Sequence, residues 1–122
     1  MPVVRGSGLD FVRLPGRRSA DPLHGAGIDT GASVRVVRIA SGPRTPHVHP
    51  LSAEVAYVAE GAGTAWEGDE PTALGPGDLL VIPRGAPHAT VATGPADLVL
   101  VCFFAHPDLA ANLRELAGPL RE

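Results

Sequence analysis

Three histidines and one glutamate are the residues of this chain whose types and spacing could do chemistry together. His47 and His49 are two positions apart, Glu54 follows five positions later, and His88 lies further along the chain. On a β-strand, residues i and i+2 point to the same face about 7 Å apart, so both of the first two imidazoles can reach one ion. Three neutral imidazoles and one carboxylate suit Fe, Mn, Co, Ni or Zn, and octahedral geometry leaves two positions for substrate or O2. We therefore expect one divalent transition metal per chain.

Turn residues between these side chains predict how the backbone brings them together. Pro50, Leu51 and Ser52 separate His49 from Glu54, and a hairpin-like return there would carry the carboxylate back to the same site. His88 follows a Pro/Gly turn at residues 83–87, whose kinked backbone can deliver a side chain into a barrel interior.

Glycine and proline residues divide the rest of the chain into short apolar segments. The 122 residues include 15 glycines and 13 prolines, a pattern typical of an all-β barrel or sandwich in one domain. We expect a barrel over residues 31–106, an N-terminal extension over 1–30, and a short C-terminal helix and tail over 107–122. Leu109, Leu113 and Leu116 would share one face of that helix, which Gly118-Pro119 would end. The expected strands are 33–40, 48–49 with its flanks, 54–60, 63–67, 78–82, 89–92 and 96–105.

Composition excludes several classes of function. The net charge of -3 suggests neither a nucleic-acid partner nor an anionic membrane. All ten basic residues are arginines, so Schiff-base and lysine-base mechanisms are excluded. The single cysteine, Cys102, cannot form an intrachain disulfide, and no signal-peptide or membrane-spanning stretch is present, so we expect a cytoplasmic protein.

The spacing of the four candidate ligands resembles that of a known family. The two motifs are Gly42-x4-His47-x-His49-x4-Glu54-x6-Gly61 and Gly77-x5-Pro83-x-Gly85-x2-His88. They resemble the two motifs of the cupin superfamily over residues 33–104, and the fifteen residues between Gly61 and Gly77 are similar to the spacing in small single-domain members. The resemblance implies a conical antiparallel jelly-roll barrel with His47, His49, Glu54 and His88 as metal ligands. Gly42 is one residue closer to His47 than usual, and Ala92 stands where the second motif often ends in Asn, which affects local turn geometry rather than the ligands.

Strand alternation suggests which other side chains could line a substrate pocket. Cys102 shares a face with Phe104 and His106, and Thr90 shares one with His88. Cys102 is also typical of a small buried apolar group. Arg38 is the candidate for holding a substrate carboxylate, with a solvated strand arginine as the alternative. The pocket candidates are Arg38, Thr90, Cys102, Phe104 and His106.

The leading hypothesis for function is a metal-dependent enzyme acting on a small organic molecule. A dioxygenase-type reaction with O2 is the first candidate, with Fe slightly favoured as its metal and Glu54 as ligand or, if it swings away, as catalytic base. The alternatives are a redox-neutral isomerase, cyclase or lyase that uses the metal as a Lewis acid, and a non-catalytic small-molecule or metal-binding protein.

Residues 9–14 are the one part of the N-terminal extension that alternates enough to form a strand. Exchange of this strand with a second chain would cover an open sheet edge and predicts a homodimer. The alternative is an N-terminus folded back on its own barrel.

Overall fold

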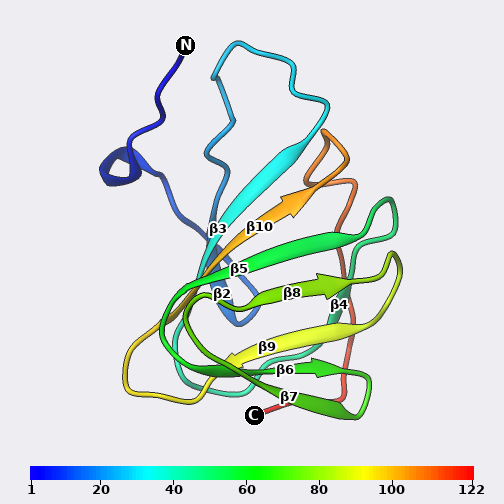
Figure 1. Ribbon diagram of the computed structural model, residues 1–122. Helices are drawn as coiled ribbons and strands as arrows, with labels where there is room; N and C mark the ends of the chain where they lie inside the picture. The colour runs from blue at the N-terminus through cyan, green and yellow to red at the C-terminus, as the bar shows by residue number, and fades with distance from the viewer.

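The computed structural model describes all 122 residues, and they form two antiparallel β-sheets that enclose a common interior. The six-stranded sheet has the order β1-β2-β3-β10-β5-β8, and the five-stranded sheet has the order β11-β4-β9-β6-β7. Figure 1 shows β3, β10, β5 and β8 side by side in one sheet and β9, β6 and β7 side by side in the other. The all-β, antiparallel jelly-roll architecture is the one that the sequence predicted. The elements are η1 (Gly6–Gly8), β1 (Val12–Leu14), β2 (Arg17–Ala20), β3 (Ser33–Ile39), β4 (His47–Val48), β5 (Glu54–Glu60), β6 (Gly63–Glu67), β7 (Glu70–Leu74), β8 (Leu79–Ile82), β9 (His88–Ala92), β10 (Leu98–Phe104) and β11 (Arg114–Glu115).

The core forms because alternate residues of the strands point inward. In β10, Leu98, Leu100, Cys102 and Phe104 are buried, whereas Phe103 is exposed. Eleven buried residues from β3, β5, β8, β9 and β10 make one continuous cluster. Full burial of a large apolar side chain contributes about 1.5–3 kcal/mol, so this cluster can hold the barrel together without an ion.

Two glycines close the turn between β5 and β6. Gly61 has a φ of +82°, and a Cβ there would lie 2.3 Å from the carbonyl oxygen of Asp97. A Cβ on Gly63 would lie 2.4 Å from the carbonyl oxygen of Val91. Only glycine therefore lets this turn pack against the neighbouring strand ends.

The C-terminal segment differs from the prediction, because no helix forms over residues 107–122. Instead, Arg114–Glu115 forms β11 and pairs with β4. The Leu116 N–H donates to the Pro46 carbonyl at 3.0 Å, and Arg44 and Arg121 exchange backbone hydrogen bonds of 2.9 and 2.8 Å. An isolated helix this short is marginal in water, whereas the otherwise open edge of β4 offers a row of backbone partners.

Besides β11, two further strands were not expected from the sequence. β2 has no apolar alternation, because its inward residues include the polar Arg17 and Ser19. β7 is an exposed edge strand over residues to which the sequence analysis assigned no strand, and Pro71 is tolerated there because edge strands leave N–H groups unpaired.

The N-terminal segment folds back on its own barrel in this single chain. β1 pairs with β2, and β2 pairs with β3. The guanidinium groups of Arg18 and Arg38 lie 5.7 and 5.8 Å from the centre of the Phe11 ring. The chain thus adopts the second of the two arrangements considered for residues 1–30, and the homodimer remains a prediction. No helix of the structure is long and apolar enough to cross a bilayer, and the cytoplasmic location also remains a prediction.

Candidate metal centre

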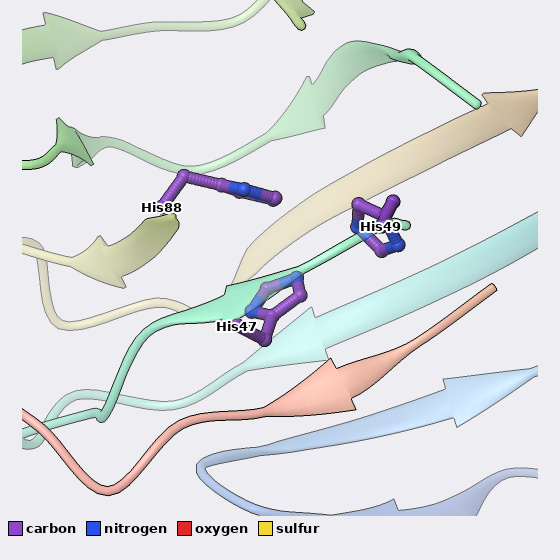
Figure 2. A group of neighbouring side chains, drawn as sticks. All are labelled: His47, His49 and His88. Atoms are coloured by element: carbon purple, nitrogen blue, oxygen red, sulfur yellow. The ribbon is translucent and has the colours of Figure 1, made fainter. Parts of the chain in front are cut away.

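Three histidine rings meet inside the barrel. His47 of β4 is the register partner of His88 of β9, and His49 lies just beyond the end of β4. All three are buried, and their nearest ligand atoms lie within 4.8 Å of one another. Figure 2 shows the His88 ring extending from β9 toward the rings of His47 and His49. These distances allow all three imidazoles to reach one ion.

Backbone carbonyls set the protonation of two of the rings. His49 Nδ1 lies 2.7 Å from the carbonyl oxygen of Asn112, and His88 Nδ1 lies 2.9 Å from that of Ala86. A carbonyl can only accept, so each Nδ1 carries the proton and each Nε2 has its lone pair free. Both Nε2 atoms are buried without a hydrogen-bond partner.

Glu54 faces these two free nitrogens from β5. Its Oε2 lies 3.2 Å from His49 Nε2, and its Oε1 lies 3.6 Å from His88 Nε2. Burial by itself raises the pKa of Glu54, but the contacts with His49 and His88 outweigh burial and bring the pKa down to about 2. With both ring protons on Nδ1, the oxygens of Glu54 face two nitrogen lone pairs in a buried site, and a cation between them would bind all of these atoms. The donor set therefore fits a divalent transition metal.

His47 has a different neighbour. Arg44 Nη2 lies 3.2 Å from His47 Nδ1, and since a guanidinium can only donate, this Nδ1 accepts and the proton of the neutral ring lies on Nε2. Burial, followed by repulsion from His88 and Arg44, holds the pKa of His47 far below its usual range, so the ring is neutral. His47 fits a metal through Nε2 once Arg44 Nη2 turns away from Nδ1.

The other predicted pocket residues divide into two groups. Thr90 and Cys102 line the cavity beside the histidines, and the Phe104 ring centre lies 4.6 Å from that of His49. Burial raises the pKa of Cys102 well above its usual range, so its thiol is un-ionised.

Arg38 and His106 lie outside this cavity. Arg38 points outward because the inward residues of β3 are Ser33, Arg35, Val37 and Ile39, and it contacts Phe11 instead. His106 follows the end of β10, where strand alternation no longer applies, and its Nδ1 accepts a hydrogen bond from the Asp108 N–H at 3.1 Å.

Three arginines that sequence reasoning missed line the cavity: Arg17, Arg35 and Arg44. Arg35 could have been found from strand alternation, because it is two positions from the inward Val37. No local sequence pattern indicates that Arg17 or Arg44 lines the cavity. The free space among these side chains is about 20 Å³, and since one water molecule needs about 10–15 Å³ on this scale, the cavity has room only for a small group.

A larger groove adjoins the site. It has a volume of about 240 Å³, and His88 and Thr90 contribute to both spaces. Its other walls come from β6, β7 and β8 and include Trp66 and Leu80.

Comparison with known proteins identifies relatives of this fold. Residues 35–104 match the family described as Cupin domain. A cupin-superfamily sugar phosphate isomerase from Silicibacter pomeroyi is 21% identical with a TM-score of 0.71, covering 84% of this chain and 74% of that one. The polyketide cyclase RemF from Streptomyces resistomycificus is 24% identical with a TM-score of 0.72, covering 85% and 78%. Oxalate decarboxylase OxdC from Bacillus subtilis is 18% identical with a TM-score of 0.75, covering 88% and 30%. At these identities the likeness establishes the fold. A search among curated proteins finds no match.

Proposed function

Because this chain belongs to the Cupin domain family, we propose that it is a metal-dependent enzyme acting on a small organic molecule. In this proposal His47, His49, Glu54 and His88 hold one divalent transition metal. The observation that carries it is the pair of buried, unpartnered Nε2 atoms of His49 and His88 facing the Glu54 carboxylate. Without a cation, this arrangement would place lone pairs and a negative charge against one another in a dry site.

The protein side chains would have distinct roles in such a site. The metal, when bound, would polarise an oxygen of the substrate as a Lewis acid. The carbonyl groups of Asn112 and Ala86 orient two of the rings, which fixes the direction of their free lone pairs. Both carboxylate oxygens of Glu54 face the nitrogens of candidate ligands, so we assign Glu54 as a ligand rather than as the catalytic base.

Redox-neutral chemistry, such as isomerisation, cyclisation or lyase chemistry, is the reaction class that the cavity favours. Its lining is polar and cationic, with Val37, Leu100 and Cys102 as its apolar members, and this suits a polar substrate with an oxygen to polarise. The isomerase and the cyclase among the similar structures perform reactions of this kind. Dioxygenase chemistry is the second candidate, because three imidazoles and one carboxylate also suit Fe(II) with open positions.

A homodimer is also part of the proposal, and an apolar outer face supports it. On the six-stranded sheet, Val101, Tyr57 and Leu79 are cross-strand neighbours, and so are Phe103, Val55 and Val81 in the adjacent row. All six side chains are exposed, by 37% for Val55 up to 72% for Val81. A contiguous apolar patch of this kind is typical of a contact surface, and we propose a second copy of the chain as its partner.

The test of reaction class uses protein loaded with Zn(II), Mn(II) or Fe(II) and a panel of small oxygenated substrates. We expect a substrate to be converted without O2 consumption on an oxygen electrode, with the product identified by NMR. Substrate-dependent O2 uptake by the Fe(II) form would instead support the dioxygenase. Ligand binding without conversion by any of the three forms would refute an enzymatic role.

A further inference from the structure

Three arginines give the cavity an excess of positive charge. Arg17 comes from β2, Arg35 from β3 and Arg44 from the segment before β4. Arg17 and Arg44 are buried and Arg35 is half-buried. Glu54 is the one carboxylate that lines the cavity with them. A buried charge without a counter-charge is costly, so it matters which of these arginines already have one.

Arg17 is paired within the protein. Its Nη2 lies 2.8 Å from Glu115 Oε1, and its Nη1 donates to the carbonyl of Pro15 at 2.8 Å. Its charge is therefore compensated, and its role is to hold β2 against β11.

Arg44 has no carboxylate partner. It is 4% exposed, its Nη1 donates to the carbonyl and hydroxyl oxygens of Thr90 at 3.0 and 2.9 Å, and its Nε is buried without any hydrogen-bond partner. Its guanidinium is positively charged at neutral pH. When His47 presents Nε2 to a metal, its Nδ1 carries the proton and Arg44 Nη2 also loses its acceptor. Two N–H groups of Arg44 are then available to a ligand.

Arg35 lies between the cavity and the surface. It lines the cavity and also an outer pocket formed with N-terminal residues that include Leu9 and Ser19. Its Nη1 donates to Ser19 Oγ at 3.0 Å and its Nη2 to the Leu109 carbonyl at 3.4 Å, and no carboxylate lies within ion-pairing distance. Asp10 and Asp21 line the outer pocket but form no ion pair with Arg35, so this guanidinium is free to bind an anion at the boundary of the cavity.

We propose that the substrate carries a carboxylate group, which Arg35 and Arg44 bind beside the metal site. A guanidinium presents parallel N–H groups that match the two oxygens of a carboxylate. The free space of about 20 Å³ suits a flat carboxylate better than a tetrahedral phosphate. This inference rests on the proposed function, since the same cavity contains the metal ligands, and it names the substrate class.

The test is calorimetric titration of the full chain, metal-free and Zn(II)-loaded, with acetate, oxalate and inorganic phosphate. We expect one carboxylate to bind per chain and to bind more tightly than phosphate. Arg35→Met and Arg44→Met should each weaken that binding on the order of ten- to a hundredfold, because each removes a charge-assisted hydrogen bond. Arg38→Met is the matched control, since it removes an arginine from the outward face of the same strand and should leave binding unchanged.

Three results would overturn the proposal: no binding of either carboxylate to the wild-type protein in both forms, tighter binding of phosphate, or equal affinity in Arg35→Met and wild type. A thermal melt establishes that each variant is folded. If Arg44→Met does not fold, the titrations of wild type and Arg35→Met still test whether the cavity binds a carboxylate. Failure of the proposed function is a separate result. It would appear as absence of Zn(II) binding in a protein that binds carboxylates, whereas the reverse pattern would refute the carboxylate site alone.

Discussion

Asn112 connects the C-terminal segment to the turn that carries His49, and its replacement by alanine gives a sharp test of the site's construction. The side chain is 1% exposed; its Oδ1 accepts from the Leu51 N–H at 2.8 Å, and its Nδ2 donates to Ser52 Oγ at 2.8 Å. The backbone carbonyl of the same residue orients the His49 ring. One substitution thus removes two hydrogen bonds from the loop beneath a candidate ligand.

The expected decrease in the free energy of unfolding follows from these contacts. Each lost hydrogen bond contributes about 1 kcal/mol, and leaving a partly buried Leu51 N–H without its acceptor adds a similar amount, so we expect Asn112→Ala to lower the free energy of unfolding by about 2–3 kcal/mol. Ser52→Ala keeps the bond from the Leu51 N–H to Asn112 but removes the Asn112–Ser52 bond and the bond from Ser52 Oγ to the Ala53 carbonyl, so it should lower the free energy of unfolding by about 2 kcal/mol. Zn(II) affinity of Asn112→Ala should fall about 10- to 100-fold, because the backbone carbonyl that orients the His49 ring is kept but loses the side-chain hydrogen bonds that fix its position against the loop.

Urea denaturation of the metal-free proteins measures the stabilities, and competition with a chromogenic chelator measures the affinities. A free energy of unfolding for Asn112→Ala within about 0.5 kcal/mol of wild type, the range of an ordinary surface substitution, would show that these hydrogen bonds do not stabilise the loop. A large loss of stability with unchanged Zn(II) affinity would show that Asn112 supports the fold and does not position His49.

Three further predictions follow from burial and charge. The metal-free protein should lose stability as pH falls below 6.5, by up to about 1.4 kcal/mol per pH unit, because His47 takes up a proton in the unfolded chain but not in the folded chain. A second loss of stability should follow between pH 4.5 and 2, because Glu54 becomes protonated in the unfolded chain at a higher pH than in the folded chain. In urea melts at several pH values, His47→Gln should reduce the dependence of the free energy of unfolding on pH below 6.5. An unchanged dependence would contradict the role of His47. Cys102 should not react with a thiol reagent at pH 8 in the native protein and should react once per chain after unfolding, so rapid native labelling would contradict its raised pKa. Light scattering should find a dimer that Val81→Lys or Phe103→Lys converts to a monomer. Ile28→Lys, at an exposed residue outside this face, should leave the dimer intact. A monomeric wild type, or a dimer lost only on deleting residues 1–30, would refute the outer-face interface.

Much of the fold could be predicted because apolar alternation marks most of the strands. The bounds of β5 and β6 match their predictions residue for residue, and Tyr57 points outward as its parity with Glu54 requires. β2 could not be found this way, since the cavity it lines demands polar residues on its inward face. The C-terminal helix was predicted from local pattern alone, and pairing with β4 overrode that pattern.

The candidate ligands could be selected from their spacing in the sequence, but the residues that hold the ligands and the surrounding loop in place could not. His47 and His88 are brought together by strand pairing that the motif spacing anticipates. Arg44 and Asn112 act on residues distant in the chain: Arg44 contacts Thr90, and Asn112 contacts His49 and Ser52. Such contacts depend on the packed barrel and leave no periodic signal in the sequence. Arg38 was selected because it precedes the first motif, whereas parity would have selected Arg35.

The most direct test of the metal site is a measurement of bound metal per chain. Chelator-stripped protein is dialysed against Zn(II), Mn(II), Fe(II), Co(II) or Ni(II), and the ion content is determined by mass spectrometry. We expect one tightly bound ion per chain in the wild type and in His106→Ala, whose ring lies outside the cavity, and loss of that ion in a folded His88→Ala. A wild-type chain that binds none of these ions, or a His88→Ala chain that retains a full complement, would contradict the assignment of the site.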